Sequence, residues 1–314
     1  MRKVIGMGET IMDIIFHGQT PTAAIPGGSS FNSIVSVGRA GIPAIFLGET
    51  GNDEVGRRIA HFLKASHVDA SYLRVRNDIQ SAVSLAFLDE HNDAQYMFYK
   101  QPPRSLPGFV APSINPNDIV QFGSYYALNP YIRNEVKSFL TLAKQHGAIL
   151  YYDLNYRRTY RNRIQELLPI IHENYRLAHI VRGSADDFEI MYGLSDAQEI
   201  YKKHIAPYCN LFICTHGAND IVVCTPQLTF NFPVRPIKAV STIGAGDNFN
   251  AGFIYGLIRY NIGQSQLLNL DGDHWKLLLD CGCRFSAHVC ESIYNSISED
   301  FGRRLAAELS SAPA

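Results

Sequence analysis

The stretch STIGAGDNFNAGF, residues 241–253, places two glycines and an acid where a turn becomes a helix. Gly244 and Gly246 carry no Cβ, so the backbone can approach a ligand closely. The apolar residues that follow are spaced as on one face of a helix, whose unpaired N–H groups favour an anion at its start. Asp247 stands at this junction. The turn therefore has three possible roles: it only starts a helix that the acid caps, it binds nucleotide phosphates, or it is the centre of a reaction.

Two common nucleotide-binding motifs do not fit this stretch. A P-loop needs Gly-x4-Gly-Lys-Ser/Thr, and no such string occurs in the sequence. A dinucleotide fingerprint, Gly-x-Gly-x-x-Gly, would need glycine where Phe249 stands, and it usually follows an early strand. The string GMGETI at 6–11 lacks the third glycine in the same way.

Length and composition limit the class of protein. With 314 residues, of which 46% are hydrophobic, the chain can form one large α/β domain or two small ones. A net charge of -1 argues against nucleic acid or an anionic membrane as the main partner and favours a small ligand. Glu9 and Asp13 interrupt the N-terminal apolar residues, which argues against a signal peptide. No apolar run approaches the roughly 20 residues of a membrane span.

The cysteines show no metal or disulfide pattern. They lie at positions 209, 214, 224, 281, 283 and 290, without Cys-x-x-Cys pairing or histidines at zinc spacing. We expect reduced, mostly buried thiols in a cytoplasmic protein.

Short apolar runs alternate with helical segments along the chain. Strands are expected at 3–8, 44–49, 118–123, 148–154, 178–183 and 210–215, and helices at 29–40, 53–66 and 131–147. Ser29 or Ser30 is the expected N-cap of the first helix. This alternation predicts right-handed βαβ units around a mostly parallel sheet flanked by helices.

Two segments interrupt the alternation. Residues 12–26 separate the first strand from the first helix, and residues 81–104 contain an expected hairpin with its turn in the polar group 89–93. We interpret both as a lid on a single domain that spans 1–314. The alternative is a pair of ordinary surface hairpins.

Two long blocks of the sequence resemble the signatures of the ribokinase-like (PfkB) carbohydrate kinases. The stretch at 241–253 is similar to the second signature, Asp-Thr-x-Gly-Ala-Gly-Asp-x-Phe. GGSSFNSIVSVGRAG at 27–41, followed by GETGNDEVGRRI, resembles the first. The resemblance implies a three-layer ribokinase-like α/β fold with a small β-sheet lid. It also implies a kinase that transfers the γ-phosphoryl group of ATP to a sugar hydroxyl with Mg²⁺.

The resemblance assigns roles at the glycine turn. Asp247 matches the base that accepts the proton of the attacking hydroxyl, and the backbone amides of Gly244, Ala245 and Gly246 match the family's anion hole. Phosphoryl transfer depends on positioning and electrostatics, so the acceptor and the charged oxygens must be held at one point.

Sugar-binding residues follow from the same resemblance. Asp13, Gly27, Gly28 and Asn32 match family positions that contact sugar hydroxyls. Taken alone, Asp13 would be a solvated acid beyond the first strand, and Asn32 would be a helix cap.

A second group of matches follows later strands. YYDLNYR at 151–157 resembles the family's Asp-x-Asn-x-Arg element, at the strand end where open α/β sheets bind ligands. We expect Asn155 to bind substrate and Arg157 to face the nucleotide phosphates, although a surface salt bridge explains Arg157 equally well. Thr215 and Gly217 match the family's Thr-x-Gly turn beside the nucleotide.

Two positions depart from the family pattern. Asp187 stands where many members carry the glutamate of Asn-x-x-Glu, and it is a candidate to hold Mg²⁺ through water. Ser241 stands where many relatives have aspartate, which leaves dependence on K⁺ open.

The expected acceptor is a ketohexose such as fructose, with ribose, a sugar phosphate or a nucleoside as alternatives. A non-catalytic sugar sensor and a dinucleotide-dependent oxidoreductase are rivals from other classes. The intact GAGD string argues against the first and the missing third glycine against the second. A homodimer through exposed lid strands is left open.

Overall fold

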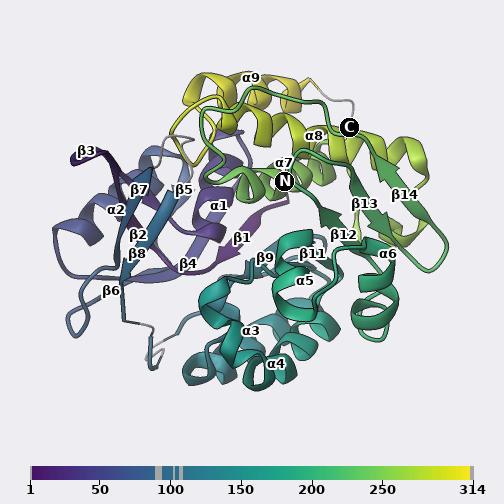
Figure 1. Ribbon diagram of the computed structural model, residues 1–314, viewed down its shortest axis with the longest axis horizontal. Helices are drawn as coiled ribbons and strands as arrows, with labels where there is room; N and C mark the ends of the chain where they lie inside the picture. Colours follow the sequence, from purple (N-terminus) through teal and green to yellow (C-terminus); the bar gives the residue numbers. More distant parts are fainter. Residues whose placement is uncertain (1, 89–93, 102, 106–108, 312–314) are drawn as a thin grey trace. The chain divides into compact units, whose positions relative to one another are not determined.

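The computed structural model describes residues 2–88, 94–101, 103–105 and 109–311 (Figure 1). The chain divides into two compact units, each built from separate segments. Unit 1 comprises Met1–Pro103, Ile237–Tyr260 and Asp280–Ala314, and unit 2 comprises Arg104–Pro236 and Asn261–Leu279. The single domain over 1–314 with a lid at 12–26 and 81–104 stays a prediction.

Unit 1 contains a parallel group of strands. It consists of β1 (Val4–Met7), β4 (Ala44–Gly51), β5 (Val68–Asp69) and β6 (Leu73–Arg76). β4 pairs in parallel with each of the other three. β1 is buried at every position, as expected of a parallel strand covered on both faces. Helix α1 (Ser29–Arg39) packs on β1 and β4, and α2 (Glu54–Ala65) packs on β4.

The prediction that Ser29 or Ser30 caps α1 is wrong. The N-cap is Gly28, with a φ of 129° and no side-chain cap bond. A Cβ at Gly28 would lie 2.3 Å from the carbonyl oxygen of Glu9. Glycine is needed because the chain turns into the helix in a left-handed conformation against neighbouring backbone.

A second sheet in unit 1 joins segments that are far apart in the sequence (Figure 1). Its strand order is β3 (Thr20–Gly27), β2 (Ile11–His17), β7 (Val83–Leu88) and β8 (Ala94–Tyr99). β2 pairs antiparallel with β3 and parallel with β7, and β7 and β8 form the hairpin expected after residue 81. The predicted turn at 89–93 lies outside the described residues.

The glycine turn leads into α7 (Ala245–Arg259), which packs against α1 (Figure 1). Its N-cap, Gly244, has a left-handed φ of 76°, and Asp247 lies in the first turn. Phe249, Phe253 and Leu257 are all buried, as their helical spacing predicts.

Unit 2 contains a path of six neighbouring strands. The first four pair in parallel, and the fifth pairs antiparallel with both the fourth and the sixth. The order is β9 (Ile119–Gly123), β10 (Ile149–Asp153), β11 (Ile180–Ser184), β12 (Phe212–Thr215), β13 (Ile221–Cys224) and β14 (Thr229–Phe232). α3 (Arg133–Gln145) and α4 (Ile164–Leu177) pack on β10, α5 (Ala185–Tyr192) on β11 and α6 (Ala197–Ile200) on β13. The six strands expected from the sequence are confirmed as β1, β4, β9, β10, β11 and β12.

The remaining α-helices of the described residues are α8 (Gly272–Cys290) and α9 (Glu299–Ser310). No helix in the described part of the chain is long and apolar enough to cross a membrane.

All six cysteines are described and all are free, with only Cys283 less than fully buried. Burial raises the pKa of the thiols, to about 12 for Cys214 and about 11 for Cys209. The expected buried, unpaired thiols are confirmed, and their raised pKa makes them poor nucleophiles at neutral pH.

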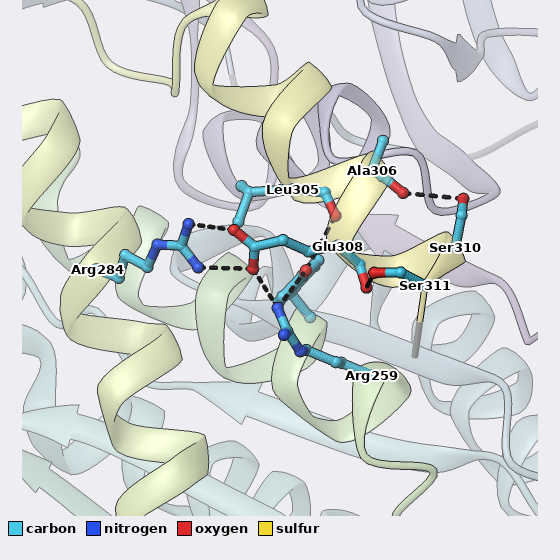
Figure 2. Close-up of polar contacts among 8 residues, drawn as sticks. Arg259, Arg284, Leu305, Ala306, Glu308, Ser310 and Ser311 are labelled. Carbon is cyan, nitrogen blue, oxygen red and sulfur yellow. Dashed lines mark hydrogen bonds and ion pairs between the residues drawn. The ribbon is translucent and has the colours of Figure 1, made fainter. Parts of the chain in front are cut away.

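An ion-pair network joins α7, α8 and α9 within unit 1 (Figure 2). Arg284 donates to both carboxylate oxygens of Glu308, at 2.8 and 2.5 Å, and Arg259 pairs with Oε2 of the same carboxylate. The hydrogen bonds from Arg284, followed by those from Arg259, lower the pKa of Glu308 from 4.5 to about 2, while burial acts in the opposite direction.

Replacing Glu308 should therefore give a pH-dependent loss of stability. A carboxylate with a lowered native pKa stabilises the fold above its unfolded pKa and loses that effect as pH falls toward the native value. Because the three side chains remain partly exposed, we expect Glu308→Gln to lower the unfolding free energy at pH 7 by about 1 kcal/mol. The gap to wild type should close between pH 5 and about 2 in urea unfolding. Glu54→Gln, whose pairs with Arg57 and Arg58 are exposed, is the control and should cost under about 0.5 kcal/mol.

Candidate active site

Three polar side chains of unit 1 surround Gly27, the last residue of β3. A Cβ built at Gly27 would lie 2.6 Å from Oδ2 of Asp13, 2.9 Å from Nδ2 of Asn295 and 3.4 Å from Oδ1 of Asn32. The three come from β2, α1 and the segment before α9. The missing side chain thus lets polar groups from three parts of the sequence converge on one point.

Asp13 is not a solvated acid beyond a strand, as the sequence alone suggested. It lies inside β2, paired with Ile25 of β3 and Ser84 of β7, and it is half-buried. The buried Ser84 hydroxyl donates to Oδ1 of Asp13. Strand alternation places Asp13 on the same face as Ile15, which packs with Ile25 and Ala86 in a buried apolar cluster. The carboxylate is therefore fixed at the border of an apolar surface.

Asn32 links this cluster to the predicted base. Its Nδ2 donates to Oδ2 of Asp247 at 2.8 Å, so the amide orients the carboxylate and does not cap α1. Its Oδ1 is buried and has no hydrogen-bond partner among the described residues. An unpaired buried acceptor costs free energy until a donor reaches it, so this oxygen points to a ligand or an ordered water.

The backbone of the glycine turn is half-buried. Gly244, Ala245 and Gly246 precede Asp247 at the start of α7, where N–H groups have no intrahelical acceptor. The Ala245 N–H donates to the Thr242 carbonyl at 3.2 Å, the long end of the normal range, so this bond is weak. The turn thus joins amides at a helix start, a position that favours anions, to a carboxylate.

Ser241 orders the turn without the aspartate of the family signature. Its hydroxyl accepts from the Ile243 N–H at 3.2 Å, and its own N–H donates to the Cys290 carbonyl at 3.3 Å. In the described ranges, no group of three or more His, Cys, Asp or Glu side chains is placed to hold a metal. The bearing of Ser241 on K⁺ dependence stays open.

The structure adds a network that sequence reasoning missed. Asn248 donates from Nδ2 to the carbonyls of Gly244 and Asn295, both at 2.8 Å, and its Oδ1 accepts from the Ser36 hydroxyl at 2.5 Å. Ser36 in turn accepts from the Ile297 N–H at 3.0 Å. One buried amide thus fixes the glycine turn relative to the segment around Asn295.

In unit 2, a buried cluster forms at the carboxyl ends of neighbouring parallel strands. Arg182 on β11 pairs with Oδ1 of Asp153 on β10 at 3.1 Å and donates to the Thr215 hydroxyl on β12 at 2.7 Å. All three side chains are at least nine-tenths buried. Thr215, which was matched to the nucleotide site, is thus joined to this cluster by a hydrogen bond.

Asn155, Arg157 and Gly217 lie in loops that follow strands of unit 2. Asn155 has a positive φ of 41° and donates from Nδ2 to the Ser124 hydroxyl at 2.7 Å. Gly217 has a φ of 53° in an exposed turn. Arg157 is exposed, and within the described ranges no ion pair involves it.

Asp187 serves as a capping residue in the structure. Its Oδ2 accepts from the Ser184 N–H at 2.7 Å and from the Ser184 hydroxyl at 2.9 Å, which completes a capping box on α5. Burial raises the pKa of this carboxyl. The role of Asp187 in holding a metal through water stays a prediction.

A cavity of about 570 Å³ opens beside the Thr215–Gly217 turn. Its lining includes Cys214, His216, Asp196, Asp220 and Asn231, all within unit 2. Its volume is within the roughly 300–1,000 Å³ of small-molecule sites.

The chain belongs to the pfkB family of carbohydrate kinases, whose family model matches residues 1–300.

Individual relatives support this assignment. The chain is 27% identical to aminoimidazole riboside kinase of Salmonella typhimurium over 277 residues, 85% of each chain. It is 26% identical to fructokinase of Klebsiella pneumoniae over 268 residues, 83% of this chain and 86% of the relative.

Solved structures confirm the predicted ribokinase-like α/β fold. Fructokinase of Vibrio cholerae, in its form with fructose, ADP and calcium ion, matches with a TM-score of 0.80 at 23% identity, over 98% of this chain and 99% of that one. Aminoimidazole riboside kinase of Salmonella enterica matches with a TM-score of 0.81 at 22% identity, over 98% and 100%.

Proposed function

We propose that this carbohydrate kinase uses ATP to phosphorylate a hydroxyl of a ketohexose such as fructose, with Asp247 as the base. One observation carries the proposal: Asn32 hydrogen-bonds Asp247 at 2.8 Å and also borders the polar cluster around Gly27. The base is thereby held next to side chains suited to binding a polyol. Relatives that are named fructokinases support the choice of acceptor.

In this proposal, the reaction is a single displacement. The acceptor hydroxyl gives its proton to Asp247 as its oxygen forms a bond to the γ-phosphorus of ATP. The bond from that phosphorus to the oxygen bridging the β-phosphate breaks, and ADP leaves with the electron pair. The N–H groups at Gly244, Ala245 and Gly246 stabilise negative charge on the transferred phosphoryl oxygens.

Unit 2 supplies the nucleotide-binding groups in this proposal. The hydroxyl of Thr215, the backbone of Gly217 and the exposed guanidinium of Arg157 are suited to phosphate oxygens. The cavity beside Thr215 supports a nucleotide there by its size.

Mg²⁺ belongs to the proposal as an ion held mostly by phosphate oxygens and water, which is its usual mode in kinases. Among the described residues, no three or more His, Cys, Asp or Glu side chains gather to hold an ion, which is compatible with ligands from phosphate and water. Asp187 would approach it through water, and the ion would offset phosphate charge. K⁺ dependence is left to experiment because Ser241 replaces the family aspartate.

The proposal also covers setting and assembly. The buried thiols with raised pKa fit a cytoplasmic enzyme.

β8 is an outer strand of its sheet and exposes Met97, Phe98 and Tyr99, at 53%, 49% and 57%. Such an edge can pair with a second copy, so we include a homodimer through this sheet.

The test is ATP consumption against a panel of fructose, ribose, a hexose phosphate and a riboside, each with and without K⁺. We expect fructose to give the highest kcat/KM. A higher value for the riboside would move the acceptor to the nucleoside class, and consumption by no member of the panel would overturn the kinase proposal.

A further inference from the structure

The side-chain amide of Asn295 lies beside Gly27, but the residue is not part of either sequence signature. Its Nδ2 donates to the Pro26 carbonyl at 3.1 Å, which fixes the plane of the amide. Its Oδ1 is buried and has no hydrogen-bond partner among the described residues, and the residue is only 3% exposed. Its Nδ2 would lie 2.9 Å from a Cβ at Gly27, so this second unpaired acceptor belongs to an amide that borders the same point as Asn32 Oδ1.

The segment that carries Asn295 is held rigidly. Asn248 donates to the Asn295 carbonyl at 2.8 Å, and Ser36 accepts from the Ile297 N–H at 3.0 Å. Arg39 donates to the Ile297 carbonyl at 2.7 Å. Gly244 is in contact as well, since a Cβ there would lie 2.8 Å from the Asn295 carbonyl oxygen. The unpaired oxygen is therefore preorganised and does not result from a loose loop.

We propose that Asn295 is a substrate-binding residue whose Oδ1 accepts a hydrogen bond from one hydroxyl of the acceptor sugar. Asn32 Oδ1 and the Asp13 carboxylate supply further acceptors around the same point. Asn32 Oδ1 and Asp13 Oδ2 face Gly27 together with the Nδ2 end of the Asn295 amide, and acceptors grouped in this way select a ligand with several donor groups, which is the chemistry of a polyol. This inference rests on the proposed function and adds a specificity-determining residue to its acceptor site.

Two measurements test the assignment. Wild type should turn over one monodeoxy analogue of the accepted sugar, lacking the contacted hydroxyl, with kcat/KM reduced about 10- to 100-fold, because the site then leaves buried acceptors unpaired. Asn295→Ala should lower kcat/KM for the parent sugar by a similar factor of about 10 to 100, mostly through KM. With that one analogue, Asn295→Ala and wild type should have nearly the same kcat/KM, because the contact is already lost. The KM for ATP should not change.

The control is Asn129→Ala, which removes a buried asparagine of unit 2. It is expected to lower the melting temperature and leave the sugar KM as in wild type. If Asn295→Ala lowered kcat/KM by the same factor for the parent sugar and for every deoxy analogue, the assignment would be wrong. The kinase function would not be affected by that result. If Asn295→Ala does not fold, wild-type turnover decides, because uniform turnover of all deoxy analogues contradicts the contact. Wild type that phosphorylates no sugar would overturn the proposed function first, and the inference with it.

Discussion

Asp247→Asn is expected to lower kcat by about 10²- to 10⁴-fold, the usual contribution of a positioned general base. The amide has nearly the same shape but cannot take the acceptor proton. Asn32 donates to Oδ2 of Asp247, and the variant can keep this bond through its amide oxygen. The sugar and ATP should therefore bind much as in wild type. Single-turnover phosphorylation together with calorimetric binding separates the two effects.

Asp273→Asn is the matched control, because Asp273 also lies in the first turn of a helix and is exposed. It should keep full turnover. If Asp247→Asn retained a tenth of wild-type kcat, the proton would have another acceptor and the assigned role would be wrong.

Gly27→Ala is expected to raise the KM for sugar by about 10- to 100-fold, since overpacking typically costs about 1–3 kcal/mol. The new methyl would lie 2.6 Å from Oδ2 of Asp13 and 2.9 Å from Nδ2 of Asn295. At 2.6 Å the methyl must displace the Asp13 carboxylate from the position in which Ser84 holds it. With sugar bound, the methyl and the ligand compete for one space. Initial rates over a range of sugar concentrations measure the effect, and the KM for ATP should be unchanged.

The control is Gly272→Ala, where the nearest atom to the new Cβ is the Phe230 ring edge at 3.3 Å. That ring is partly exposed and can yield, so both KM values should match wild type. An unchanged sugar KM in Gly27→Ala would mean that the acceptor binds elsewhere.

The sequence was sufficient for the fold wherever local patterns carry the information. Buried apolar runs predicted β9 to β12, and the glycine turn predicted the start of α7. The cap of α1 was missed because Gly28 is required by a contact with the distant Glu9 carbonyl, which no local cap motif reveals.

For the candidate site, the family resemblance predicted Asp13, Asn32 and Asp247, but not what surrounds them. Ser84 lies 71 residues after Asp13 in the sequence, and Asn295 lies 269 residues after Pro26. These side chains meet only because strands and loops from distant parts of the chain pack together. A lone serine or asparagine carries no sequence pattern that would single it out.

The bond between Ser36 and Asn248 has a consequence for how this enzyme can evolve. Both side chains are fully buried and each also holds a further backbone group, so changing one leaves the other with an unmet hydrogen bond. Substitutions at positions 36 and 248 should therefore be tolerated as pairs and rejected singly. Selection for a new acceptor would be expected to alter side chains that border Gly27 long before it alters this pair.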